Sequence, residues 1–236
     1  MKYLFDVDGT LTPSRQKIEK DLEYYLIDFF SYYDCSIVTG SDYDKTHEQL
    51  GSTIMNLAEY SFNCSGNVVY KKQKEISRNL WTCPDDLREF LNKTLDQSGF
   101  DIRSGNHIEE RPGTINFSIV GRNADLNERF IYTVYDNKFN ERVTIAKAIN
   151  DNFDGIEAVV GGETGIDIFE KGKDKRQVLS YFNENETFCF FGDKIIPGGN
   201  DYSLGKLLDK RYSNTVFNVS SPEETFRILQ QIDGRE

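Results

Sequence analysis

The sequence has few histidines, few cysteines and no long hydrophobic run. It contains 2 histidines and 4 cysteines in 236 residues, so a histidine-based metal cluster or catalytic triad is nearly excluded. The cysteines form no C-x-x-C pair, which argues against a zinc site or a disulfide framework. No apolar run is long enough to cross a bilayer, and no signal peptide precedes the first expected strand. These absences predict a cytoplasmic protein with reduced, mostly buried cysteines.

Positive charge is also scarce. The chain has 28 Lys and Arg against 39 Asp and Glu, a formal net charge of −11, so nucleic acid and anionic membranes are not expected partners. An anionic substrate would need a local cluster of arginine and lysine to overcome this overall field. Apolar residues make up 38% of the chain, as in a globular protein of one large domain or two modest ones.

Two closely spaced acids follow the first apolar segment. Residues 3–5 indicate a short buried strand, after which come Asp6, Asp8 and a Gly-Thr turn. Two carboxylates this close repel each other unless a cation or a proton lies between them. A solvated turn is one alternative. A calcium loop is another, but its glycine stands at the sixth position, whereas Gly9 is the fourth residue counted from Asp6. The stretch therefore predicts a metal-binding nucleophile site.

Short apolar strands alternate with amphipathic helices at both ends of the chain. This pattern is typical of an α/β fold with a Rossmann-like parallel sheet, in which ligands bind beyond the carboxyl ends of the strands. The strands are expected at 3–5, 35–38, 188–191 and 215–219, with a hairpin over 60–74. The helices are expected from about 18 to 30, 42 to 50, 173 to 182, 202 to 208 and 222 to 232.

The middle of the chain has a different pattern. Strands are expected near 101–103, 107–109, 114–120, 156–160 and 166–169, and helices near 84–95, 127–137 and 142–152. Such a mixture predicts an antiparallel sheet with helices on one side, a small α+β domain inserted into the first. The predicted boundaries place the core in residues 1–76 and 172–236 and the inserted domain in residues 77–171.

Polar side chains at the expected strand ends, together with Lys175 at the start of an expected helix, fit phosphoryl transfer, which needs a nucleophile, Mg²⁺ and cationic or hydroxyl groups around the phosphoryl oxygens. Carboxylates suit Mg²⁺, a carboxylate nucleophile can form an aspartyl phosphate, and a second carboxylate can move the proton. The candidate residues are Asp6, Asp8, Thr39 or Ser41, Lys175, Asp193 and Asp201.

These motifs resemble those of the haloacid dehalogenase-like phosphotransferase superfamily. Asp6-Val7-Asp8-Gly9-Thr10 is similar to its first motif, Ser41 (or Thr39) to its second, Lys175 to its third, and Gly192-Asp193 with Gly199-Asn200-Asp201 to its fourth. The resemblance implies that Asp6 is the nucleophile and Asp8 the general acid and base. It also implies Mg²⁺ bound by Asp6, by the Asp8 position through a carbonyl, and by Asp193 and Asp201. The inserted domain would be a cap of the sugar-phosphate type.

Longer motifs resemble the eukaryotic-type phosphomannomutase family. They include residues 5–18, 40–51 and 190–201, and the segment from Arg111 to Arg129. The resemblance implies that Arg111, Arg122 and Arg129, with Arg15 from the core, bind a substrate phosphate and that Asp167 contacts sugar hydroxyls. The sequence departs from the family at Gly165, where a serine hydroxyl is missing, and at Cys64-Ser65-Gly66. The family's second cation site is not matched after Asp201, where Lys206 could replace the ion.

The resemblance implies a phosphohexomutase that interconverts mannose 6-phosphate and mannose 1-phosphate, and glucose phosphates as further hexose phosphate substrates. Such an enzyme is primed by a hexose 1,6-bisphosphate, uses Mg²⁺, serves mannose metabolism and GDP-mannose formation, and is a homodimer through the cap. The alternatives are a sugar-phosphate phosphatase of the same superfamily and a binding protein without turnover. A mutase needs a second anion site for the other phosphate, so the arginines favour it.

Overall fold

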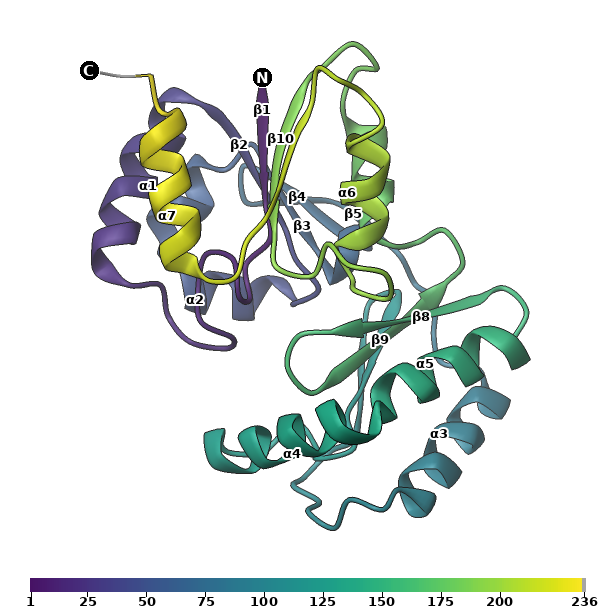
Figure 1. Ribbon diagram of the computed structural model, residues 1–236. Coiled ribbons are helices and arrows are strands. Elements are labelled where there is room, and N and C mark those ends of the chain that lie inside the picture. The colour runs from purple at the N-terminus through teal and green to yellow at the C-terminus, as the bar shows by residue number, and fades with distance from the viewer. Residues whose placement is uncertain (235–236) are drawn as a thin grey trace.

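The structure, a computed structural model, describes residues 1–234. Within these residues the strands form two sheets, one above the other in Figure 1. The larger sheet has the order β11-β10-β1-β2-β3-β4-β5 and the smaller one β6-β7-β9-β8. The larger contains β1 (Lys2–Phe5), β2 (Asp34–Val38), β3 (Tyr60–Asn63), β4 (Val68–Lys71), β5 (Lys74–Arg78), β10 (Phe188–Gly192) and β11 (Thr215–Asn218). The smaller contains β6 (Ile108–Arg111), β7 (Thr114–Phe117), β8 (Ile156–Gly161) and β9 (Gly165–Glu170).

The larger sheet forms the core, and its two faces are covered by different helices. Tyr3 and Phe5 of β1 pack with α1 (Lys20–Tyr32), α2 (Tyr43–Leu57) and α7 (Pro222–Ile232). Leu4 points the other way, against the 3₁₀ helix η2 (Lys175–Tyr181) and α6 (Tyr202–Leu208). Alternate residues of a strand point to opposite faces, so a strand buried on both sides is apolar throughout, as residues 3–5 are.

The core sheet is mixed rather than wholly parallel. The strands from β11 to β3 pair in parallel, whereas β4 and β5 extend the sheet antiparallel. The predicted hairpin thus supplies the antiparallel edge. Because β5 continues to Arg78, the predicted boundary after residue 76 falls inside a core strand.

Two core helices differ from their predicted form. The helix expected to end near residue 50 continues to Leu57, with a break at Gly51, whose φ of 77° is outside the helical range. Glycine adopts this conformation without steric cost, so the chain turns and then resumes the helix. The helix expected over 173–182 is a 3₁₀ helix from Lys175 to Tyr181.

The smaller sheet and three helices form the cap. Its helices are α3 (Asp85–Gln97), α4 (Leu126–Phe139) and α5 (Glu141–Asn152), and they cover the face of the sheet that carries Ile115, Phe117 and Ile168. The opposite face of this sheet is turned toward the core (Figure 1). The predicted α/β core with an inserted α+β cap is therefore confirmed.

Two details of the cap prediction are wrong. Residues 101–103 form no strand. Instead, the Arg103 guanidinium donates to backbone carbonyls, including Leu95 O of α3 at 3.2 Å. The strand expected over 114–120 ends at Phe117. Among residues 1–234, no helix combines the length and the apolar character needed to cross a membrane.

Candidate active site

A cleft lies between the carboxyl ends of the core strands and the polar face of the cap sheet. The ends of β1, β2 and β10 bring Asp6, Ser41 and Asp193 to it. This is the place where parallel α/β sheets bind ligands. The sequence predicted that these side chains would meet at one edge of the sheet.

Three carboxylates gather at the core side of the cleft. Asp6, Asp193 and Asp201 each offer an oxygen within 4.8 Å of the others. The fully buried Lys175 Nζ donates to Asp6 Oδ1 at 2.6 Å and to Asp201 Oδ1 at 2.7 Å. One buried ammonium against three carboxylates leaves an excess of negative charge, which Lys194 offsets in part through an ion pair of 2.9 Å with Asp193. The donor set fits a hard divalent cation such as Mg²⁺.

The protonation of this cluster reflects its burial. Burial and the nearby Asp201 charge raise the pKa of Asp193 to about 6. Burial opposes the charge of Lys175 as well, but Asp201 and Asp6 outweigh it and raise the pKa of the ammonium. A divalent cation favours the charged carboxylates, since it supplies the opposite charge that the cluster lacks.

Gly9 makes room for this cluster. Its φ is 86°, and a Cβ added there would lie 2.5 Å from Asp193 Oδ2. Any side chain at this position would therefore displace the Asp193 carboxylate as well as strain the backbone. The glycine of the first motif is needed for the approach of β10 to the turn after β1.

Asp8 is held apart from the three carboxylates. Its Oδ1 accepts from Arg15 N at 2.6 Å and from Gln49 Nε2 at 3.0 Å, and its Oδ2 accepts from Ser41 Oγ at 3.2 Å. The Asp8 side chain thus faces the cleft rather than the cluster, a position suited to proton transfer. Asp8 is not among the three carboxylates that gather around Asp6, so its predicted metal contact, through the backbone carbonyl, stays a prediction. Thr39 lies beneath, where its Oγ1 accepts from Ser41 N at 3.1 Å.

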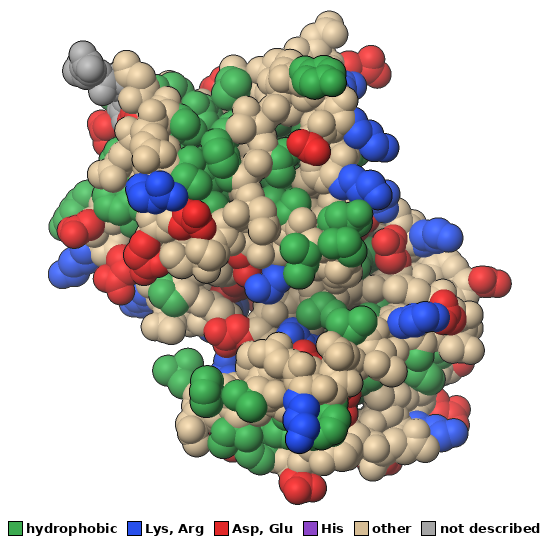
Figure 2. Space-filling model, in the orientation of Figure 1, with side chains coloured by type: hydrophobic (Ala, Val, Ile, Leu, Met, Phe, Trp, Pro, Cys, Tyr) green, Lys and Arg blue, Asp and Glu red, His purple; other side chains and the backbone are tan. Residues whose placement is uncertain are grey.

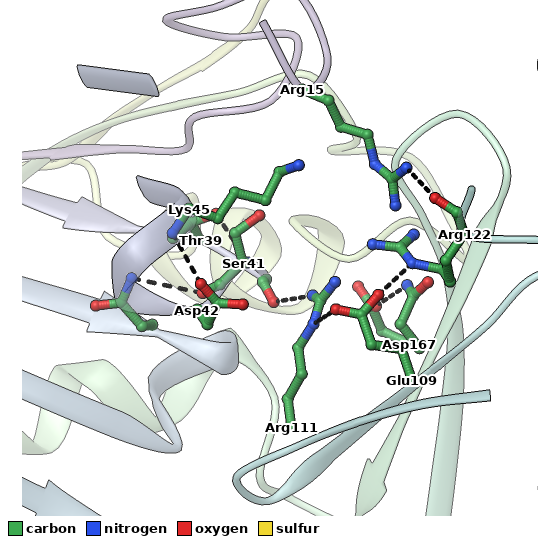
Figure 3. A network of polar contacts seen from close by, with 12 residues as sticks. Arg15, Thr39, Ser41, Asp42, Lys45, Glu109, Arg111, Arg122 and Asp167 are labelled. Carbon is green, nitrogen blue, oxygen red and sulfur yellow. Dashed lines mark hydrogen bonds and ion pairs between the residues drawn. The ribbon is translucent and has the colours of Figure 1, made fainter. Parts of the chain in front are cut away.

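Positive side chains line the other side of the cleft. Arg15 comes from the core, and Arg111, Arg122 and Arg129 come from the cap. Figure 3 shows Arg15 reaching toward Arg122 across the domain boundary, where Arg15 NH1 donates to the Arg122 carbonyl at 3.0 Å. Arg111 NH1 donates to the Gly40 carbonyl of the core at 2.6 Å. These contacts hold the cap closed over the core.

Glu109 is an acid that sequence reasoning did not assign to the site. It accepts from Arg111 Nε at 3.0 Å and also from Arg122 Nε (Figure 3). Burial opposes its charge, but the two guanidinium groups prevail and lower the pKa of Glu109 to about 2. Glu109 therefore stays ionised and fixes the orientation of both arginines.

The cationic side of the cleft remains under-neutralised. Burial and the charges of Arg122 and Arg129 lower the pKa of Arg15 to about 10. Burial and Arg15 also lower the pKa of Lys45, which lines the same cleft. A cluster of cations that disfavour one another's charge is a strong site for a multiply charged anion.

Asp167 lies on β9 of the cap sheet and lines the cleft. Its neighbour across the strands is Asn116, whose Nδ2 donates to Asp167 Oδ1 at 2.7 Å. Asn116 in turn lies opposite Glu109. A Cβ added at Gly165 would lie 2.6 Å from Asn116 Nδ2, so Asn116 occupies the space that a serine would use. Gly165 lines the cleft with backbone alone.

The predicted residues all lie at this cleft or directly behind it. Lys175 and Asp201 are fully buried behind Asp6. The cleft also contains residues for which the sequence predicted no role of their own, namely Ser14, Lys45, Asn116, Glu163 and Asn200. Lys206, considered as a replacement for a second cation, instead lies over the Tyr202 ring at 5.2 Å from its centroid.

Comparison with known proteins gives one family. A model of the eukaryotic phosphomannomutase family matches residues 22–233. The chain is 34% identical to a phosphomannomutase of Spinacia oleracea, over 97% of this chain and 94% of that protein. It is 36% identical to one of Arabidopsis thaliana, over 94% and 92%, and 33% identical to one of Saccharomyces cerevisiae, over 97% and 92%.

Solved structures share the fold at lower identity. An IMP-nucleotidase of Plasmodium falciparum superposes with a TM-score of 0.64 at 18% identity, covering 99% of this chain and 70% of that one. A haloacid dehalogenase-like hydrolase of Bacteroides thetaiotaomicron superposes with a TM-score of 0.57 at 15% identity, covering 96% and 98%. At these identities the likeness extends to the arrangement of core and cap.

Proposed function

The chain belongs to the eukaryotic phosphomannomutase family, and we propose that it interconverts mannose 6-phosphate and mannose 1-phosphate, with glucose phosphates as further substrates. One observation supports this above the others: the acidic cluster around Asp6 faces a cationic cluster of four arginines across the same cleft. A hexose bisphosphate has a phosphate for each side. A phosphatase needs only the side at Asp6.

Asp6 is the proposed acceptor of the phosphoryl group. Its Oδ1 accepts from Lys175 and its Oδ2 from Thr10 Oγ1 at 3.3 Å, so the carboxylate is fixed at the end of β1. In the proposed reaction the O1 hydroxyl of mannose 6-phosphate attacks the phosphorus on Asp6. The bond from phosphorus to the Asp6 oxygen breaks, and Asp8 takes the hydroxyl proton. The product is the 1,6-bisphosphate.

The second half-reaction reverses the roles of the two phosphates. The bisphosphate turns over in the cleft, Asp6 attacks the phosphorus at O6, and Asp8 returns the proton to the departing O6. Mannose 1-phosphate leaves, and Asp6 again carries the phosphoryl group. The arginines hold whichever phosphate is not reacting. A hexose 1,6-bisphosphate is the proposed activator because it phosphorylates Asp6 at the start.

The acidic cluster is the proposed Mg²⁺ site, with Asp6, Asp193, Asp201 and the Asp8 carbonyl as its protein ligands. When bound, Mg²⁺ would neutralise phosphoryl oxygens during transfer. Lys175 balances part of the negative charge from behind, and the closed cap limits the access of water to the aspartyl phosphate.

A coupled assay tests the function. The purified chain is given mannose 1-phosphate, Mg²⁺ and a catalytic amount of mannose 1,6-bisphosphate, and mannose 6-phosphate and free phosphate are measured in parallel. We expect isomerised sugar in large excess over free phosphate. Release of free phosphate without isomerised sugar would replace the mutase by the phosphatase alternative. Binding without either product would indicate a protein that has lost turnover.

Replacing Arg122 by alanine should raise the KM for mannose 1-phosphate by about 10-fold to 100-fold, because a charge-assisted hydrogen bond to phosphate contributes about 1.5–3 kcal/mol. Binding of Mg²⁺ should be unchanged, since the acidic cluster lies on the other side of the cleft. The contact from Arg15 is made to the Arg122 carbonyl and survives the change.

Arg88→Ala is the matched control for this variant. Arg88 belongs to the cap but is partly exposed on α3, in an ion pair with Glu110. Steady-state kinetics and Mg²⁺ titration compare the two. Equal KM values for Arg122→Ala and Arg88→Ala would show that Arg122 does not bind the phosphate.

A homodimer through the cap is a further part of the proposal. Apolar side chains spaced four residues apart lie exposed along α4, at Leu126, Phe130 and Val134. Figure 2 shows hydrophobic side chains gathered over this part of the cap. A second copy of the chain, with the same face, would cover such a stripe in a symmetric interface. The cytoplasm is the proposed location, where the four free, buried cysteines would stay reduced.

Sedimentation velocity tests the dimer. We expect the unaltered chain to sediment as a dimer and Phe130→Asp as a monomer, because the charge would be buried in the interface. Tyr24→Asp is the control, since Tyr24 is similarly exposed but lies on α1 of the core. A monomeric unaltered chain would overturn the proposal, as would a Phe130→Asp variant that remains a dimer.

A further inference from the structure

Arg129 differs from the other arginines of the cleft in the partner that holds it. Its guanidinium is buried, with Nε at 3.1 Å and NH2 at 2.7 Å from one oxygen of Glu163. NH2 also lies 3.4 Å from Ser14 Oγ of the core. The remaining nitrogen, NH1, is buried at the cleft with no hydrogen-bond partner. One edge of Arg129 is therefore taken by an internal anion while NH1 is available.

Glu163 is placed where it can leave Arg129. It lies in the turn between β8 and β9, after Gly162, and its side chain is 49% exposed. It lines the active cleft and also a second cleft beside it, to which Lys194 and Ser221 contribute. Glu109 lacks this freedom, because two arginines hold it and its side chain is 29% exposed.

We propose that Glu163 competes with the distal phosphate of the substrate for Arg129 and thereby weakens the hold of the cap on that phosphate. A phosphate binds an arginine most strongly through two parallel N–H···O bonds. While Glu163 accepts from Nε and NH2, a phosphate can accept only from NH1 and from an NH2 group that it shares with Glu163. Glu163 also neutralises the guanidinium charge that attracts the phosphate.

The benefit of this competition to the enzyme rests on the proposed mutase activity. A bisphosphate that must turn over between half-reactions has to release its distal phosphate from the arginines without leaving permanently. A carboxylate that takes over Arg129 as the phosphate departs avoids leaving a buried, unpaired charge, which is costly. Glu163 then raises the release rate at the expense of affinity.

The binding of inorganic sulfate, a probe of the phosphate site that needs no turnover, tests the proposal. By calorimetric titration, Glu163→Gln should bind sulfate about 5-fold more tightly than the unaltered chain. This is the largest change in affinity expected from the loss of one partly exposed ion pair. Glu163→Asp, which is one methylene shorter and reaches Arg129 less well, should change in the same direction. Glu157→Gln is the matched control: it removes the same charge from the same hairpin, where Glu157 faces Arg176.

The effect must depend on Arg129. In an Arg129→Gln background, the additional Glu163→Gln change should leave sulfate binding unaltered. In the isomerase assay, Glu163→Gln should lower both KM and kcat. A merely structural role of Glu163 would not lower the two together. Sulfate binding that is unchanged or weaker than in Glu157→Gln overturns the proposal, as does a gain that persists without Arg129. A protein that binds sulfate as expected but does not isomerise sugar would overturn the mutase function and leave the competition at Arg129 standing.

Discussion

Replacing Asp6 by asparagine should lower turnover by ~10⁴-fold or more, because the amide cannot form the aspartyl phosphate through which the transfer proceeds. The side chain keeps its size and its acceptor toward Lys175 Nζ. The variant also removes one negative charge from a cluster that has an excess of them. Its midpoint of thermal unfolding should therefore be equal to that of the unaltered chain or higher.

Initial rates in the coupled assay and thermal unfolding are measured together. Asp154→Asn is the control, because Asp154 is exposed in the turn before β8 and should keep full activity. Substantial turnover by the Asp6→Asn protein would mean that another group accepts the phosphoryl. Lost turnover together with a lower unfolding midpoint would mean that the effect was one of folding.

Replacing Lys175 by methionine should lower the free energy of unfolding by about 3–5 kcal/mol, the usual consequence of removing one partner of a buried ion pair. Lys175 has no exposed surface, and its ammonium separates Asp6 from Asp201. Without it, the two carboxylates face each other in a buried site. Activity should fall as well, since the remaining carboxylates repel an incoming phosphate.

Denaturant unfolding with and without Mg²⁺ measures this effect. Added Mg²⁺ should stabilise the Lys175→Met protein more than the unaltered chain, because the cation would be the remaining counter-charge of the cluster. Lys173→Met is the control at an exposed neighbouring position. A loss of stability no greater than that of the control would show that Lys175 is not needed to balance the acidic cluster.

The sequence was most informative about residues that follow strands. Asp6, Ser41 and Asp193 are far apart in the chain, but each follows within three residues of an apolar segment, and parallel strands place such positions at one edge of a sheet. Their meeting could be predicted without knowing the exact strand pairing. The inserted antiparallel sheet was predicted for a similar reason, from segment types and their order.

The positions of Glu109 and Glu163 at the site depend on tertiary contacts, which the local sequence does not reveal. Glu109 shares a face of the cap sheet with Asn116 and Asp167 because β6, β7 and β9 align the three residues, and a shift of one residue would turn Glu109 to the other face. Glu163 lies in a turn, where the contact with Arg129 is set by how the hairpin meets α4. The 3₁₀ form of residues 175–181 has the same origin, since tertiary contacts around Lys175 outweigh local propensity.

The strand order of the core sheet has a consequence for biosynthesis. β1 lies between β2 and β10, so the first strand made must wait for residues 188–192, near the end of the chain, before its second edge is paired. The cap sheet is drawn from the continuous segment between β6 and β9 and can form earlier on the ribosome. During synthesis, the edge of β1 that will pair with β10 is open to wrong pairing, next to the future nucleophile Asp6.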